Sequence, residues 1–269
     1  MLMSGWSSLE ADQSGPKIDD ATVYHCDPAG DGCTFLRIPG TLCDHRVWSK
    51  LDWPTHWVTR DVSLFDCVDF ERTASDILTT HPGRLIPVGF SMGGMIALEI
   101  ARQAPERITG LVLIGTNHLA DSKERHAVRM RNLRLLETAG LPITVSEELI
   151  PRYFGANPDP ENVQSVMQMA LAAGPAVLRR QYEALTSRRD QTGTVKQCAA
   201  PVLVVTGNED VMCDPSGQQD MAALARLSDF HALPGIGHMA PLEAPNEMMR
   251  LLQQWALARI GETSCQTAF

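Results

Sequence analysis

A serine between two glycines, in Gly89-Phe90-Ser91-Met92-Gly93, lies where the apolar pattern of the chain changes its period. Apolar residues alternate over 86–90, as in a β-strand, and recur at helical spacing over 95–101. This context predicts a sharp strand-to-helix turn that holds Ser91 in a strained conformation with its hydroxyl above the sheet. Glycine is needed on both sides, because a Cβ there would collide with the neighbouring strand or helix. A tight β–α connection without chemistry is the alternative interpretation of the pentapeptide alone.

Short β-type runs alternate with helical patterns along most of the chain. We expect strands at residues 22–26, 34–38, 58–62, 84–89, 111–116, 202–207 and 230–233, and helices at 70–80, directly after Ser91 and at 247–259. Alternating βα units predict an α/β fold with a mainly parallel sheet and helices on both faces. Pro87 interrupts one expected strand, since proline cannot donate a ladder hydrogen bond, and we expect a bulge or a missing pair there.

Residues 117–200 are broken by glycines and prolines into helical pieces and show no convincing strand pattern. A structureless loop of that length is improbable inside a compact domain. We therefore expect a helical cap at 117–200, inserted into a core formed by residues 21–116 and 201–262. The polar residues 1–20 are expected to form a mobile leader.

Charge and composition exclude several classes of protein. The net charge of −9 argues against a nucleic-acid binder, which needs a basic face. No stretch approaches the ~20 apolar residues of a membrane span. The N-terminus lacks the basic start and apolar middle of a signal peptide. The seven cysteines are odd in number and show no CxxC pairing, which is typical of reduced thiols in a cytoplasmic protein.

A serine hydroxyl becomes nucleophilic when a base takes its proton, and an acid must orient that base. His238 follows the last expected strand in the Gly-rich loop PGIGHMAPLEAP and is the best placed of eight histidines by chain order. In VLVVTGNEDVMCDP, Asp210 ends a turn from which its carboxylate can reach an imidazole. Glu209 is expected to point to solvent, and Asp214, before Pro215, to cap a helix. The order Ser91, Asp210, His238 is the nucleophile–acid–base order of one hydrolase fold.

Four segments together, RIPGTLCDHRVW, GFSMGG, TGNED and GIGHMAPLEAP, resemble the α/β-hydrolase superfamily. The resemblance is to its capped group of small carboxylesterases, cofactor-free haloperoxidases or perhydrolases, and pimeloyl-carrier-protein methyl ester esterases. It spans residues 22–259 and is weakest in the expected cap. Where this family has His-Gly-x, the chain has Pro39-Gly40-Thr41. The match implies that the Thr41 N–H is one oxyanion donor and the Met92 N–H the other, with the Leu42 N–H as an alternative.

The resemblance implies hydrolysis of carboxylic esters through an acyl-enzyme, with no metal and no organic cofactor. The expected substrate is a small-molecule ester. A carrier-protein-linked methyl ester esterase, a lactonase and a perhydrolase are alternatives on the same triad. A non-catalytic ligand-binding protein is the alternative from another class, since fold alone does not fix function.

Two groups of residues in or near the expected cap bear on the substrate. Candidate pocket-lining side chains, for which ordinary core packing is the alternative, are Met92, Met95, Tyr153, Phe154 and Met167. Arginines at the start of the cap, Arg125, Arg129, Arg131 and Arg134, would suit an acidic acyl carrier protein. They fall on two separate helical faces, however, which favours a solvated surface.

Overall fold

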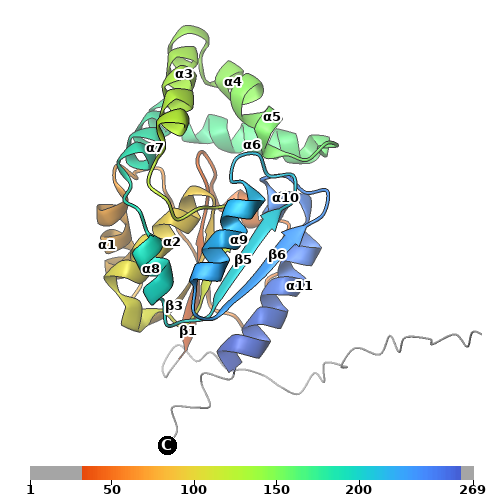
Figure 1. Ribbon diagram of the computed structural model, residues 1–269. Coiled ribbons are helices and arrows are strands. Elements are labelled where there is room, and N and C mark those ends of the chain that lie inside the picture. Colours follow the sequence, from red (N-terminus) through yellow and green to blue (C-terminus); the bar gives the residue numbers. More distant parts are fainter. Residues whose placement is uncertain (1–31, 262–269) are drawn as a thin grey trace, which may run out of the picture.

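The computed structural model describes residues 32–261 and contains a six-stranded sheet in the order β2-β1-β3-β4-β5-β6 (Figure 1). Every neighbouring pair of strands is parallel. The strands are β1 (Cys33–Ile38), β2 (Thr59–Asp61), β3 (Arg84–Phe90), β4 (Leu111–Ile114), β5 (Val202–Gly207) and β6 (Ser228–Leu233). The expected mainly parallel sheet is confirmed. The leader expected at 1–20 and the strand expected at 22–26 lie outside the described residues.

Pro87 lies directly before the start of the β3–β4 ladder. The Ser91 N–H donates to Ile114 O, and Leu85 O accepts from the Thr109 N–H. The amide groups of successive residues of a strand point to opposite sides, so the odd-numbered residues of β3, Pro87 included, face β4. Leu85 forms an isolated parallel bridge with Ile108, ahead of β4, and pairing with β4 itself begins at Val88. The missing N–H of Pro87 therefore falls between that bridge and the ladder, at a missing pair, as expected.

Helices cover both faces of the sheet (Figure 1). On one face lie α1 (Phe70–Thr80), α2 (Met92–Gln103), α8 (Thr192–Gln197) and α9 (Pro215–Leu224), each in contact with the next. On the other face α11 (Pro245–Trp255) packs against β5 and continues as a π-helical turn over Ala256–Ile260. Because β3, β4 and β5 are buried between these layers, they read as continuous apolar runs.

Helices between β4 and β5 form a layer over the carboxyl end of the sheet (Figure 1). They are α3 (Lys123–Ala139), α4 (Leu141–Thr144), α5 (Ile150–Tyr153), α6 (Pro160–Ala173) and α7 (Pro175–Ser187), with a π-helical segment at Val145–Leu149. The last helix of the inserted stretch, α8, instead packs against α2 and α9 beside the sheet. No helix within residues 32–261 combines the length and the hydropathy that crossing a membrane requires.

The strand order places one crevice above the centre of the sheet. From β1 the chain moves outward to β2 and then returns to β3 on the other side of β1. The connections that leave the carboxyl ends of β1 and β3 therefore diverge, which is where parallel α/β sheets bind ligands. Residues 39–42 follow β1 at this point, and Ser91 follows β3.

Candidate active site

Ser91 occupies a strained turn between β3 and α2. Its backbone has φ 53° and ψ −117°, outside the regions that a serine ordinarily adopts. A Cβ on Gly89 would lie 2.4 Å from Gly93 O, and one on Gly93 would lie 2.1 Å from Ile38 O. The carbonyl of Ser91 accepts from Thr116 Oγ1 at 2.7 Å. Both glycines are thus required by close approach of backbone, as the sequence predicts.

The three expected side chains meet above the sheet. His238 Nε2 lies 3.0 Å from Ser91 Oγ, and His238 Nδ1 lies 2.8 Å from Asp210 Oδ2. Asp210 and His238 are buried, while Ser91 is partly accessible. With the Nδ1 proton directed at Asp210, Nε2 is free to accept the serine proton. This is the geometry of an activated nucleophile with an oriented base.

The carboxylate of Asp210 is held in place by backbone N–H groups. Asp210 Oδ1 accepts from the N–H groups of Met212 and Cys213 at 2.7 and 2.8 Å, which leaves Oδ2 for His238. Asp214 caps α9 through its carboxylate, as expected. Glu209 is exposed, as expected, and its Oε2 also accepts from the Ala156 N–H at 3.0 Å.

A second carboxylate, that of Glu243 at the end of α10 (Ala240–Glu243), joins the histidine loop to the inserted helices. Its Oε2 accepts from the N–H of Gly237, adjacent to His238, at 3.2 Å and from that of Gly155 at 2.9 Å. Burial raises the pKa of Glu243, and its other oxygen is buried without a partner. The sequence pattern does not point to this residue, although it lies only five positions after the histidine.

The connection after β1 forms a four-residue turn beside the strained turn that holds Ser91. The Cys43 N–H donates to Gly40 O at 3.1 Å and closes it. The Leu42 N–H donates to Gln181 Oε1 at 2.9 Å, so it is engaged on the side of α7. A Cβ on Gly40 would lie 3.2 Å from Ser91 Cβ, which places the Gly40–Thr41 peptide beside the serine. Met92 begins α2, whose first N–H groups have no intrahelical acceptor.

Aromatic and buried neutral groups surround the histidine. Its ring lies 5.2 Å from that of Phe90 and 5.6 Å from that of Tyr153. Burial raises the pKa of the Tyr153 hydroxyl well above its usual value and that of the nearby Cys43 thiol to about 12. Neither residue is ionised at neutral pH, so Asp210 supplies the negative charge in contact with the imidazole.

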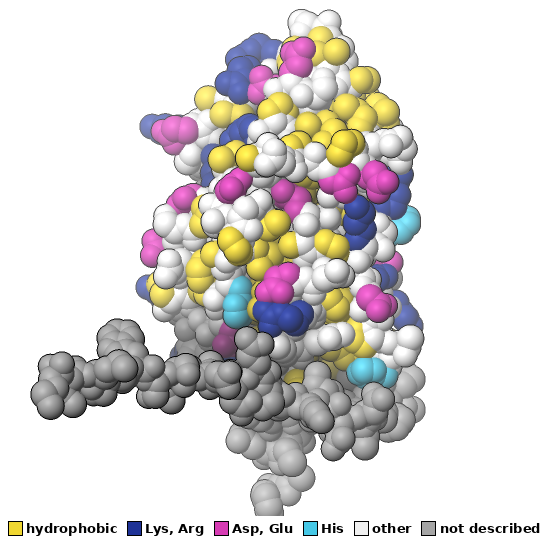
Figure 2. All heavy atoms as spheres, turned by 90° about the vertical axis from the view of Figure 1, so that its right-hand side faces the viewer, with side chains coloured by type: hydrophobic (Ala, Val, Ile, Leu, Met, Phe, Trp, Pro, Cys, Tyr) yellow, Lys and Arg dark blue, Asp and Glu magenta, His cyan; other side chains and the backbone are white. Residues whose placement is uncertain are grey.

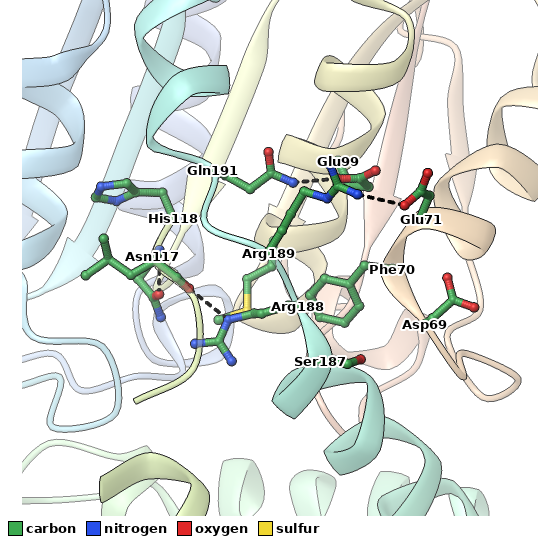
Figure 3. Close-up of a pocket in the computed structure, with 12 residues that line it drawn as sticks. Asp69, Phe70, Glu71, Glu99, Asn117, His118, Ser187, Arg188, Arg189 and Gln191 are labelled. Atoms are coloured by element: carbon green, nitrogen blue, oxygen red, sulfur yellow. Dashed lines mark hydrogen bonds and ion pairs between the residues drawn. The ribbon is translucent and has the colours of Figure 1, made fainter. Parts of the chain in front are cut away.

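The expected pocket-lining residues fall into different places. Met92 is fully buried and its Sδ lies 3.7 Å from Thr41 Oγ1, while Tyr153 and Phe154 are buried next to the histidine loop. Met167 is partly buried against the core. Met95 instead lines a cavity of about 330 Å³ on the outer side of α2 (Figure 3). Neither Ser91 nor His238 is among the residues that line this cavity.

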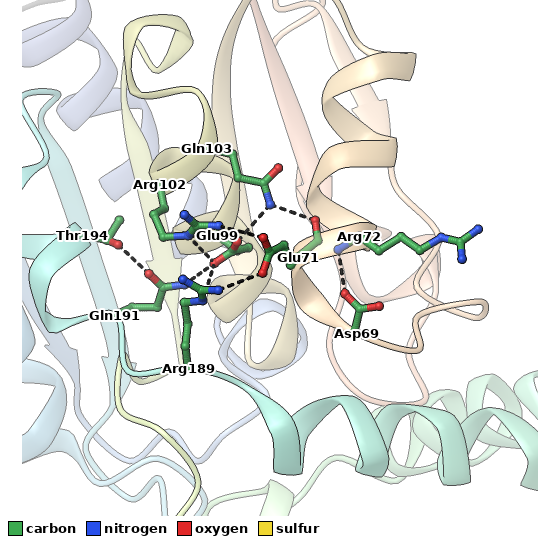
Figure 4. Close-up of polar contacts among 9 residues, drawn as sticks. All are labelled: Asp69, Glu71, Arg72, Glu99, Arg102, Gln103, Arg189, Gln191 and Thr194. Carbon is green, nitrogen blue, oxygen red and sulfur yellow. Dashed lines mark hydrogen bonds and ion pairs between the residues drawn. The ribbon is translucent and has the colours of Figure 1, made fainter.

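A polar network centred on buried Glu99 of α2 adjoins that cavity (Figure 4). Glu99 accepts from Arg102 and Gln103 of its own helix and from Gln191 of the inserted stretch. Burial alone would raise the pKa of Glu99, but these hydrogen bonds outweigh it and hold the pKa below its ordinary value. Arg189 joins the network and pairs with Glu71 of α1 at 2.8 Å. The network anchors the returning end of the insertion to the core.

Two of the four arginines at the start of the insertion are ion-paired. Arg129 contacts Asp121 in a nearly buried pair that Arg188 shares, and Arg131 pairs with Glu148 at 2.6 Å. Arg134 is exposed. On the face of the molecule in Figure 2, acidic and basic side chains are interspersed.

A family model described as serine aminopeptidase, S33, matches residues 56–245. The matched range includes Ser91, Asp210 and His238. The protein belongs to this family of α/β-hydrolases. The chain is also 25% identical over 250 residues to the pimeloyl-[acyl-carrier protein] methyl ester esterase of Nitrosomonas europaea, with 84% of this chain and 96% of that protein covered.

Solved structures of other proteins have the same fold as this protein. An esterase from Thermogutta terrifontis superposes with a TM-score of 0.72 at 25% identity, covering 85% of this chain and 91% of that one. The enol-lactonase from Burkholderia xenovorans superposes with a TM-score of 0.75 at 17% identity, over 86% and 94% of the two chains. The second likeness shows the fold alone. The α/β-hydrolase fold and the resemblance predicted from sequence are confirmed.

Proposed function

We propose that the protein is a serine hydrolase that cleaves carboxylic esters through an acyl-enzyme. The observation that carries the proposal is the continuous hydrogen-bonded chain from Ser91 through His238 to Asp210, set at the topological switch point of the sheet. Membership of a hydrolase family and similarity to two esterases support it.

In the proposed reaction His238 Nε2 takes the Ser91 proton as Oγ attacks the ester carbonyl carbon. The tetrahedral intermediate collapses, the C–O bond to the alcohol breaks, and His238 returns the proton to the leaving alcohol. Water then attacks the acyl-enzyme with His238 again as the base, and the acid leaves as Ser91 is reprotonated. Asp210 holds the imidazole in the required tautomer and stabilises its positive charge.

The N–H groups of Thr41 and Met92 are the proposed oxyanion donors, each contributing about 3 kcal/mol to the transition state. The Leu42 N–H, the alternative from sequence, is the poorer candidate because Gln181 already accepts it. The position of Met92 at the start of α2 supports its role, since the positive end of the helix dipole lies at the same place as the Met92 N–H and also favours a negative charge there.

We infer that the substrate is a small ester and that α3–α7 act as a cap over it. The closeness of Tyr153 to the His238 ring supports a lining role for the α5 end. A carrier-protein-linked ester is the second candidate, favoured by the name of the relative from Nitrosomonas europaea. The ion pairs of Arg129 and Arg131 weaken it, because paired arginines have less charge to offer an acidic partner.

We place the enzyme in the cytoplasm, where buried thiols such as Cys213 stay reduced.

A series of nitrophenyl esters from acetate to decanoate tests the proposal on the purified protein. Turnover of at least one ester, with a preference that changes with acyl length, is the expected result. Parallel assays of lactone opening and of peracid formation from acetate and hydrogen peroxide separate the lactonase and perhydrolase alternatives. Tight binding of an ester without turnover would instead indicate a ligand-binding protein.

A further inference from the structure

A buried amide from the inserted helices contacts the turn beside Ser91. Gln181 lies on α7 within an apolar stripe that includes Val177, Leu178 and Leu185, and its side chain is fully buried. Its Nε2 donates to Leu64 O at 3.0 Å, and its Oε1 accepts from the Leu42 N–H at 2.9 Å. A glutamine in such a stripe is costly unless both ends of its amide are satisfied, as they are here.

The bond to Leu42 fixes the orientation of one peptide group. Leu42 is the third residue of the turn closed by Cys43 N–H to Gly40 O, and it has φ 56°. A positive φ at this position normally calls for glycine, since other residues favour the turn in which the central peptide is reversed. That central peptide joins Thr41 to Leu42, and its N–H is the group that Gln181 accepts. Gln181 therefore opposes the reversal that a leucine favours.

The same turn places Gly40, the residue before Thr41, beside the serine. The Gly40–Thr41 peptide precedes the one that Gln181 holds, and a Cβ on Gly40 would lie 3.2 Å from Ser91 Cβ. We propose that Gln181 is a positioning residue of the oxyanion hole, which fixes the Thr41–Leu42 peptide and thereby directs the Thr41 N–H at the reacting carbonyl oxygen. This inference rests on the proposed ester hydrolysis.

The test compares Gln181→Met with a matched neighbour variant. Methionine keeps the length and volume of glutamine and removes both hydrogen bonds. Arg180→Met is the control, because Arg180 also joins α7 to the core, by donating to Phe65 O at 2.7 Å, and does not touch Leu42. Circular dichroism and thermal melting establish that each variant is folded.

We expect Gln181→Met to lower kcat about 10²-fold with KM changed about twofold or less, since a misplaced group costs transition-state rather than ground-state binding. A trifluoromethyl ketone, whose serine adduct places an oxyanion in the hole, should bind more weakly by a similar factor. Arg180→Met should leave both quantities near wild type. Unchanged kcat in Gln181→Met, or lowered kcat with unchanged affinity for the ketone, would overturn the inference.

Gln181→Glu separates the two bonds and covers the case in which the methionine variant does not fold. Ionised or protonated, the carboxyl group keeps an oxygen for the Leu42 N–H. We expect its kcat and its affinity for the ketone to stay much closer to wild type than those of Gln181→Met, or, if that variant is unfolded, close to those of Arg180→Met. Equal loss in both Gln181 variants would contradict the role of the Leu42 bond. Hydrolysis that survives Ser91→Ala would refute the proposed function itself, a result distinct from all of these.

Discussion

His238 Nε2 lies within hydrogen-bond distance, 3.0 Å, of Ser91 Oγ although 147 positions separate the two residues in the chain. The serine is held by the strained turn after β3, and the histidine by the loop after β6 at the edge of the sheet. Two independent backbone segments thus place a base beside a nucleophile, and the carboxylate after β5 completes the arrangement.

Asp210→Asn should lower kcat about 10⁴-fold, because an amide at this position favours the wrong imidazole tautomer. Glu209→Gln is the matched control on the adjacent residue, whose carboxylate contacts the Ala156 N–H and not the histidine. We expect this control to keep most of the activity in the nitrophenyl ester assay. Comparable losses in both variants would show that the acid has been assigned to the wrong residue.

Gly93→Ala should destabilise the protein by about 1–3 kcal/mol or more, since the added methyl group meets the carbonyl of Ile38 and neither backbone can move freely. Gly217→Ala in α9 is the control, where the nearest atom is Asp214 Oδ2 at 3.9 Å. The helical preference of alanine predicts a gain of up to about 1 kcal/mol there. Urea unfolding measures the stability of both variants. A Gly93→Ala protein as stable as wild type would contradict the close packing of α2 on β1.

Glu99→Gln should lower stability most at neutral pH. The pKa of Glu99 is below its ordinary value of 4.5, so its ionised form stabilises the fold above that pH and the contribution is lost as the pH falls further. The difference in the free energy of unfolding between wild type and variant should therefore shrink on acidification below about pH 4.5.

Glu243→Gln should show the opposite sign. Burial raises the pKa of Glu243, so the native state binds this proton more tightly than the unfolded state and wild-type stability falls as the pH rises through the raised pKa. The glutamine variant should gain relative to wild type from acid to neutral pH. Parallel pH profiles for Glu99→Gln and Glu243→Gln would contradict both assignments.

Arg129→Ser should cost about 1.5–3 kcal/mol, since it removes one charged hydrogen-bond donor from the nearly buried carboxylate of Asp121 while Arg188 stays paired with it. Arg134→Ser, at an exposed position of the same helix, should change the melting temperature little.

Arg134→Ser should also leave kcat/KM for a neutral ester unchanged at low and high salt. A strong salt dependence with an acidic carrier-protein substrate, abolished in Arg134→Ser, would favour the carrier-protein candidate instead.

Local signals in the sequence predict the elements that hold the nucleophile. Helix α1 covers the expected residues, Phe70–Thr80, and it begins at Phe70 because Asp69 caps its first turn by accepting from the Arg72 N–H. The turn at Ser91 follows from close backbone approach at Gly89 and Gly93, which glycine alone permits. These features depend on neighbours in the chain and are therefore visible in the pattern.

Contacts between distant segments are not visible in the same way. The bond between Gln181 and Leu42 spans 139 positions and depends on how α7 lies over the sheet. The carboxylate of Asp121 contacts Arg188, 67 positions further along the chain, as well as Arg129. A glutamine within an apolar helical stripe is the one signal that could have pointed to Gln181. Glu209 and Glu243 give no such signal, since each accepts from backbone N–H groups brought by other segments.

Covalent labelling with a fluorophosphonate, read by intact-protein mass spectrometry and paired with nitrophenyl ester hydrolysis, tests the central claim most directly. Wild type should gain one adduct, mapped to Ser91 by peptide analysis, and lose its activity in proportion to labelling. Ser91→Ala should gain none and should hydrolyse the ester at least about 10⁴-fold more slowly, with its melting temperature maintained. A folded Ser91→Ala protein that keeps a tenth of the wild-type rate, or an adduct on another residue, would contradict the account.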